Sequence, residues 1–304
     1  MEIEEPSYLT LFRSGELERR IGILKEKLKT CDICPRKCIV DRTAGESGFC
    51  RIGRSAKLAS YGPHFGEERP IVGISGSGTI FFSGCNLACQ YCQNWDISQK
   101  DAGNEVDAEE LAGIMMKIQG MGCHNINLVS PSHIVPQFLE SLEIACMRGL
   151  EVPIVYNTGG YDSIETLRLL DGVVDIYMPD MKYSDPEVGK KLSLVEDYPE
   201  NNRQAVKEMH RQVGDLKIDD RGIARKGLLV RHLVLPNGLA GTGEISRFLG
   251  EEISKDTYIN IMAQYRPEYR ADNYPEIKRN PDRDELKQSF LSARENGLWR
   301  FDRQ

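Results

Sequence analysis

Short apolar runs alternate with amphipathic segments along most of the chain. The apolar runs have the length of buried strands, and the segments between them carry apolar residues at helical spacing. The pattern predicts strands at residues 79–83, 125–130, 153–157, 173–178, 228–235 and 258–262. It predicts helices at residues 107–119, 136–148 and 163–170, in a polar stretch that ends near 213, from 244 onward, and at 283–295. Six βα units in series favour an α/β fold, an open or closed parallel βα barrel at least as well as a doubly wound sheet.

The part of the chain before this pattern is organised differently. Residues 8–29 carry Leu and Ile at helical spacing and predict one or two short helices. Residues 31–53 are rich in cysteine and turn residues, and residues 55–75 resemble a strand and a turn that lead into the main domain. We therefore expect an N-terminal metal-binding extension over residues 1–70 and a barrel over residues 71–304.

Composition restricts the class of protein. The chain has 304 residues and a formal net charge of −7, which gives no global electrostatic reason to bind nucleic acid or an anionic membrane. The acidic N-terminus lacks the basic start and apolar core of a signal peptide, and no apolar run is long enough to span a bilayer. We expect a cytoplasmic protein with neither nucleic acid nor membrane as a partner.

The nine cysteines are clustered. One group is Cys31, Cys34, Cys38 and Cys50, a second is Cys85, Cys89 and Cys92, and Cys123 and Cys146 stand alone. A cytoplasmic chain is unlikely to use these thiols for disulfides, because its compartment is reducing. Clustered thiols in such a chain indicate metal binding, whereas the two isolated cysteines are expected to be buried thiols.

The three-cysteine group, C-x3-C-x2-C, provides the most specific signal. Three thiolates can hold three irons of a 4Fe–4S cluster, and the absent fourth ligand leaves one iron open for reaction. The alternative is a zinc site in which a distant histidine, His64 or His124, completes the shell.

The four-cysteine group forms a closed ligand set. Cys31, Cys34, Cys38 and Cys50 suit structural zinc, rubredoxin-like iron or an auxiliary 4Fe–4S cluster equally well, because only the metal differs. An auxiliary cluster would relay electrons, whereas zinc would only stabilise a small loop-rich segment.

Polar residues and glycines follow each predicted strand. They are Ser130 to His133, Asn157 to Gly160, Asp180 with Lys182, Pro236 to Gly238, and Gln264 with Tyr265. In βα barrels the carboxyl ends of the strands surround the active site, so these residues are expected to ring one opening with the three cysteines. The glycines of "ISGSGTIFF" precede a strand instead of following it, which argues against a dinucleotide fold.

The segment "GCNLACQYCQN" resembles the signature of the radical S-adenosylmethionine (radical SAM) superfamily. The blocks "VYNTGGYD", "DIYMPDMKY", "RHLVLPNG" and "MAQYRP" resemble the PflX-like group, which is related to pyruvate formate-lyase activating enzyme, so the likeness covers about residues 30 to 270. The resemblance implies a partial (β/α)6 TIM-like barrel that holds a 4Fe–4S cluster and SAM. It also implies that an electron from the cluster cleaves SAM to methionine and a 5′-deoxyadenosyl radical, which abstracts hydrogen from a substrate.

The resemblance also assigns cofactor-binding residues. Tyr91 corresponds to the aromatic residue beside the adenine and Asn94 to an asparagine that contacts SAM. The polar groups placed around SAM and a nearby cation are Asn157, Thr158, Asp180 and Lys182, with Gln264 at the end of the sixth strand. The alternative for Asp180 and Lys182 is a surface ion pair at a strand end.

One departure from the family pattern concerns the second strand. Many relatives place a Gly-Gly-Glu segment there to hold the SAM amino group, whereas this chain has Ser130-Pro131-Ser132-His133. Backbone carbonyls or the Ser132 hydroxyl would take over that role. His133 either faces the substrate or caps the next helix, and His232 points either into the barrel or against a helix.

These observations favour a radical SAM oxidoreductase that acts on a protein, as glycyl-radical-activating enzymes do. Reduced flavodoxin or ferredoxin is the expected electron donor. The alternatives are radical modification of a small molecule or nucleoside, and a non-catalytic iron–sulfur or zinc scaffold protein.

Overall fold

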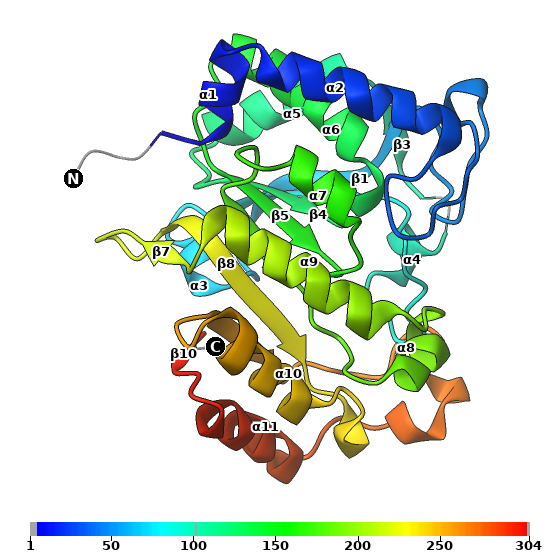
Figure 1. Ribbon diagram of the computed structural model, residues 1–304, viewed down its shortest axis with the longest axis vertical. Coiled ribbons are helices and arrows are strands. Elements are labelled where there is room, and N and C mark those ends of the chain that lie inside the picture. The colour runs from blue at the N-terminus through cyan, green and yellow to red at the C-terminus, as the bar shows by residue number, and fades with distance from the viewer. Residues whose placement is uncertain (1–4, 101, 303–304) are drawn as a thin grey trace.

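The computed structural model describes residues 5–100 and 102–302, which form a ten-stranded sheet (Figure 1). The parallel strands at its centre are β2 (Ser77–Phe82), β4 (Ile126–Val129), β5 (Ile154–Thr158), β6 (Ile176–Pro179), β8 (Ala224–Leu233) and β9 (Tyr258–Met262). The remaining strands are β1 (Ala56–His64), β3 (Asn104–Val106), β7 (Lys217–Ile218) and β10 (Arg300–Phe301). The order β10-β9-β8-β6-β5-β4-β2-β1-β3, with β7 paired to β8, leaves the barrel open.

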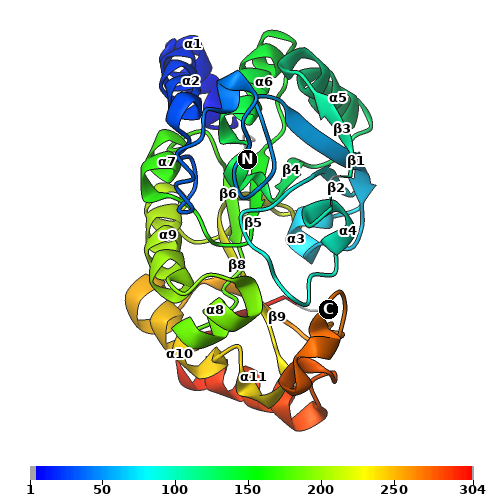
Figure 2. The same cartoon turned by 90° about the vertical axis from the view of Figure 1, so that its right-hand side faces the viewer.

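Helices cover the outer side of the curved sheet (Figure 2). They are α5 (Ala108–Gly120), α6 (Val135–Met147), α7 (Ile164–Leu169), α9 (Tyr198–Val213), α10 (Thr242–Phe248) and α11 (Arg283–Glu295). Two N-terminal helices, α1 (Tyr8–Arg13) and α2 (Glu16–Lys27), lie across α6. The short helices are α3 (Arg69–Val72), α4 (Trp95–Ser98) and α8 (Pro186–Ser193).

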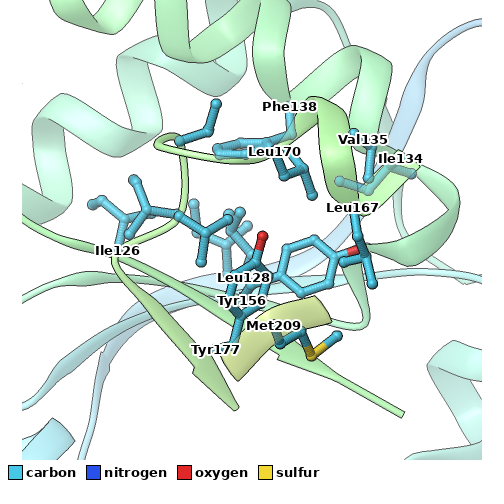
Figure 3. Close-up of a cluster of buried hydrophobic side chains, with 14 of the residues drawn as sticks. Ile126, Leu128, Ile134, Val135, Phe138, Tyr156, Leu167, Leu170, Tyr177 and Met209 are labelled. Carbon is cyan, nitrogen blue, oxygen red and sulfur yellow. The ribbon is translucent and has the colours of Figure 1, made fainter. Parts of the chain in front are cut away.

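The main core lies between the sheet and these outer helices (Figure 3). Alternate residues of the central strands, such as Leu128, Tyr156 and Tyr177, face Phe138 of α6 and Met209 of α9. Successive side chains of a strand point to opposite faces, so the residues between these point into the barrel. The strands are thus apolar outward, which fixes their register against the helices.

The inner face of the barrel is divided along the strands. Near the amino ends of the strands, Ile71 of α3 packs against Val155, Met178 and Leu229 in a separate apolar cluster. Near the carboxyl ends the inward residues are polar, among them Asn157. Apolar packing therefore closes one end of the barrel and leaves the other for a polar site.

The six predicted strands and the predicted helices are confirmed, with differences at their ends. Asp107 caps α5 in a capping box with Glu110. The long polar stretch before residue 213 is two helices, α8 and α9, because Leu194 adopts a left-handed conformation with φ of 56° and ends α8. The strand expected at 228–235 begins earlier, at Ala224.

The N-terminal extension shares the sheet of the barrel. Strand β1, which lies before residue 70, pairs antiparallel with β2. The domain boundary at residue 70 stays a prediction. None of the helices in the described residues is both long and apolar enough to traverse a lipid bilayer.

Candidate active site

A cavity of about 250 Å³ lies at the carboxyl ends of the parallel strands. It gathers residues that the sequence predicted from separate segments: Cys85, Cys89, Cys92, Tyr91, Asn94, Asn157, Thr158, Asp180, Lys182 and Gln264. We call it the barrel cavity. The expectation that these strand ends surround one opening is therefore supported for all of these residues.

The three thiols lie on a loop that other segments hold in place. The backbone N–H groups of Ala88 and Gln90 donate to the carbonyls of Ser193 and Leu192 at the end of α8. The side-chain amide of Asn86 donates to the carbonyl of Tyr161 over 2.6 Å. These bonds orient the thiols before any ligand arrives, which lowers the entropy cost of binding one.

A backbone N–H or a hydroxyl group lies within hydrogen-bonding distance of the sulfur of each of the three cysteines. The backbone N–H of Leu87 lies 3.4 Å from the sulfur of Cys85, and the Ser193 hydroxyl lies 3.0 Å from that of Cys89. The sulfur of Cys92 lies 3.2 Å from the Ser98 hydroxyl. Donors to sulfur stabilise thiolate charge and are one means by which proteins adjust the reduction potential of an iron–sulfur cluster.

Burial changes the pKa of two of the three thiols, Cys85 and Cys92. Burial, followed by the charge of neighbouring Cys89, raises the pKa of Cys85 to about 12. Burial also raises the pKa of Cys92. At neutral pH such groups lose their protons when a metal binds, because metal ligation requires the thiolate.

The cations of the site form a buried network. Lys182 Nζ lies 2.5 Å from Asp180 Oδ2, and Arg231 Nε lies 2.8 Å from Asp180 Oδ1. The side chains are only 13 to 18% exposed, so the alternative of a surface ion pair is wrong. Burial opposes the charges, but Arg231 and Lys182 lower the pKa of Asp180, and Asp180 raises that of Lys182. All three groups therefore stay charged at neutral pH.

Two carboxylates extend this network below the cavity. Glu67 Oε2 lies 3.7 Å from Arg231 NH1, and Glu68 Oε1 accepts a hydrogen bond from Asn260 over 2.8 Å. Glu68 is 4% exposed, and burial raises its pKa. Both belong to the segment between β1 and β2, so the turn predicted there contributes charge to the inside of the barrel.

A second polar group lies at the ends of β4 and β5. Thr158 donates to buried Asp162 over 2.7 Å, and its hydroxyl lies 2.9 Å from that of Ser132. Ser132 is not among the described residues that line the barrel cavity, and Ser130 lies there instead. Ser130 is left-handed, with φ of 59°, and turns the chain so that Ser132 supports Thr158. The assignment of Ser132 as a direct contact to SAM stays a prediction, and its hydroxyl reaches the cavity lining through Thr158.

The histidines have structural contacts. Nδ1 of His232 lies 2.7 Å from the carbonyl of Met181 and Nε2 lies 2.9 Å from Thr242 of α10, so this side chain faces a helix while its neighbour Arg231 faces the cavity. Nε2 of His133 lies 2.9 Å from the carbonyl of Ser83. Burial lowers the pKa of His133 to about 4, which keeps the ring neutral.

Pro236 to Gly238, which follow β8, were expected to ring the opening, but they are not among the described residues that line the barrel cavity. Asn237 bonds to Glu276 and Glu285, near and within α11, and is absent from the described lining of the barrel cavity.

The four-cysteine group lines a separate small cavity together with Arg36, Arg42, Phe49 and His133. We call it the four-thiol cavity. Burial raises the pKa of Cys34 to about 12. Over residues 5–100 and 102–302, no three cysteine, histidine or acidic side chains converge as they do around a single ion. Cys123 and Cys146 are buried in the main core, as predicted.

Replacing Gly160 by alanine is expected to displace Asp180. Gly160 has φ of +77°, and a Cβ atom there would overlap the backbone carbonyl oxygen of Asp180. Because backbone cannot move aside cheaply, we expect unfolding in urea to show a loss of about 2–5 kcal/mol, the combined cost of a left-handed alanine and of overpacking.

Gly149 is the matched control for this substitution. It has φ of +86°, but nothing lies within 4 Å of an added Cβ atom. Gly149→Ala should therefore cost only the backbone strain, about 1–2 kcal/mol. Equal losses for the two variants would contradict the close packing of Gly160 against the site.

Comparisons with known proteins agree with this geometry. The family model of the radical SAM superfamily matches residues 79–220, from β2 and the cysteine loop into the segment after β7. The chain belongs to the radical SAM superfamily. Members normally bind a 4Fe–4S cluster and SAM, and the three thiols and the polar cavity have the ligand types that these cofactors require.

Two curated relatives come from Methanocaldococcus jannaschii. The uncharacterized protein MJ0674 is 34% identical over 290 residues, which span 93% of this chain and 79% of the relative. The uncharacterized protein MJ0808 is 23% identical over 268 residues, 81% of this chain and 73% of the relative. A radical SAM methyltransferase from Sphaerobacter thermophilus has a similar fold, with a TM-score of 0.51 at 15% identity over 74% of this chain and 67% of that one.

Sequence reasoning missed Arg231 and the two glutamates, Glu67 and Glu68. Arg231 lies within the apolar run "LLVRHLVL". A charged residue in a buried strand was the signal that could have found it, since such a charge needs a partner. The glutamates carried no comparable signal, because acidic residues in a turn are ordinary.

Proposed function

We propose that this protein is a radical SAM oxidoreductase of the activating-enzyme type, which removes a hydrogen atom from a protein substrate. The observation that carries the proposal is that three thiols and a buried Asp180–Lys182–Arg231 network share one cavity at the carboxyl ends of the strands. A metal cluster and a ligand with a carboxylate can both be held there.

In this proposal Cys85, Cys89 and Cys92 hold a 4Fe–4S cluster with one open iron. Such a cluster, when bound, supplies the electron that cleaves SAM. Lys182 opposes the carboxylate of SAM by charge, while Asp180 and Asn157 offer oxygens to the ribose or to a cation.

The aromatic side of the cavity suits the adenine. Tyr91 is 5% exposed, and its ring packs edge-on against Tyr183 and Tyr265. Its hydroxyl lies 2.7 Å from that of Tyr183, so the ring is fixed and presents a rigid apolar surface. Asn94, at the start of α4, lies at the same cavity.

The assignment of a protein substrate rests on the resemblance to activating enzymes. Under the same proposal, reduced flavodoxin or ferredoxin supplies the electron, the protein works in the cytoplasm, and the four-cysteine group binds a second metal centre. A small molecule or nucleoside is the other substrate class.

Isotope transfer distinguishes these substrate classes. An extract of the source organism grown in D2O would be divided by ultrafiltration into large and small molecules, and each fraction incubated with the reduced enzyme and unlabelled SAM. We expect mass spectrometry to find deuterium in 5′-deoxyadenosine with the large fraction only. Protease treatment before the assay should remove this transfer, whereas nuclease should not. Deuterium from the small-molecule fraction alone would contradict the protein substrate.

A further inference from the structure

The four-thiol cavity lies directly against the loop that carries the three cysteines. A Cβ atom at Gly84 would overlap the carbonyl oxygen of Cys50, so the backbones of the two groups touch just before Cys85. Arg36 donates from Nε to the carbonyl of Asn86 over 2.9 Å, on the other side of Cys85. The two thiol groups are therefore joined on both sides of Cys85.

A further link passes through Arg42 and His133. Arg42 NH1 donates to the carbonyl of His133 over 2.8 Å, and the ring of His133 contacts the carbonyl of Ser83 over 2.9 Å. Both residues line the four-thiol cavity, while Ser83 lies two residues before Cys85. The link is continuous through bonds and hydrogen bonds, which is the kind of path along which electrons tunnel well.

Two arginines, Arg36 and Arg42, place buried guanidinium nitrogens at the four-thiol cavity. Arg42 is 1% exposed, and its NH1 lies 3.8 Å from the sulfur of Cys31. Its NH2 and the NH2 of Arg36 are buried and have no hydrogen-bond partner among the described residues. A buried guanidinium is costly unless negative charge lies beside it. The donors therefore indicate that the cavity holds an anionic group.

A 4Fe–4S cluster satisfies these donors better than zinc does. Zinc with four thiolates presents only the cysteine sulfurs, whereas a cluster adds inorganic sulfides as acceptors for the N–H groups of Arg36 and Arg42.

The outer side of the four-thiol cavity is accessible to a protein. Phe49, which lines it, is 39% exposed, and Ile39, the residue after Cys38, is 59% exposed. Lys37 and Arg51, each two residues along the chain from one of these, are exposed, and so is Glu46 of the same segment. These exposed apolar residues give a protein electron carrier such as flavodoxin or ferredoxin a surface to contact.

We propose that Cys31, Cys34, Cys38 and Cys50 hold a 4Fe–4S cluster that relays single electrons from a flavodoxin or ferredoxin to the three-cysteine centre. The carrier loses one electron, the four-cysteine cluster gains it and then passes it on, and no bond forms or breaks in the transfer. The direction of this relay rests on the proposed function, whereas the presence of the cluster does not.

Metal analysis tests the cluster separately from SAM chemistry. In the full chain with Cys85, Cys89 and Cys92 all changed to alanine, purified without oxygen, we expect about four irons and four sulfides per chain and an electron paramagnetic resonance (EPR) signal after reduction. SAM should leave that signal unchanged. Stoichiometric zinc without iron in this variant, or no bound metal, would overturn the proposal.

Reduction kinetics test the relay. In freeze-quenched EPR samples mixed with reduced flavodoxin, the variant C34A/C38A should lose the fast reduction of the three-cysteine centre. Titanium(III) citrate, a small reductant, should still reduce that centre. Reduction by flavodoxin at the wild-type rate would overturn the relay, while failed SAM cleavage with both reductants would instead count against the proposed function.

A measurement on the wild-type protein covers the case in which C34A/C38A fails to fold. Two reduced clusters whose loops are in contact should broaden each other's EPR signals by spin coupling. A wild-type spectrum that equals the sum of the spectra of the two single-cluster variants, without broadening, would contradict two adjacent clusters.

Discussion

Changing Cys89 to alanine is expected to abolish the reductive cleavage of SAM. Cys89 lies in the barrel cavity, and the Ser193 hydroxyl contacts its sulfur over 3.0 Å. With two thiolates left, the site can no longer hold three irons of a cluster, so both the iron at this site and the activity should be lost. Methionine and 5′-deoxyadenosine released under a strong reductant, together with iron content, measure the effect.

Cys146 is the matched control for this change. It is 7% exposed and Cys89 is 8% exposed, but Cys146 packs in the main core as a small apolar residue. Cys146→Ala should cost about 1 kcal/mol of stability and leave cleavage intact. If the Cys89→Ala variant cleaved SAM at the wild-type rate, the assignment of the three thiols as cluster ligands would be refuted.

Changing Arg231 to methionine should destabilise the protein strongly. Its guanidinium lies 2.8 Å from Asp180 and 3.7 Å from Glu67, and its side chain is 18% exposed. Removing one partner of a buried ion pair leaves charge uncompensated, which costs about 3–5 kcal/mol. Urea unfolding measures this loss.

Arg211 provides the comparison on the surface. It also pairs with two carboxylates, Asp171 and Glu208, but its side chain is 56% exposed. Arg211→Met should cost about 0–1 kcal/mol. An Arg231→Met variant as stable as Arg211→Met would show that the network carries little energy.

Local spacing was sufficient to predict much of the barrel cavity. Cys85, Cys89 and Cys92 follow one strand, and Asn157 and Asp180 each end another. Parallel strands bring their carboxyl ends to one edge, so knowing the strands was enough to group these residues.

The missed residues depend on information that the sequence pattern does not contain. Arg231 and His232 are adjacent in one strand, and only the packing of α10 on His232 decides that Arg231 faces inward. Glu67 reaches Arg231 from a turn 164 positions earlier, which no local pattern indicates.

The contact between the two cysteine groups could not be predicted either. Thirty-four positions separate Cys50 from Gly84, and their contact follows from the pairing of β1 with β2 and the packing of the loops on either side. The sequence indicated two metal sites, and tertiary structure makes them neighbours.

We propose that the barrel cavity holds SAM against a cluster bound by Cys85, Cys89 and Cys92. The most direct measurement is product analysis of the anaerobically reconstituted wild-type protein with SAM and titanium(III) citrate. We predict methionine and 5′-deoxyadenosine in equal amounts, formed only when the reductant is present. A protein that carries a reduced cluster on these three cysteines and forms neither product would contradict the account.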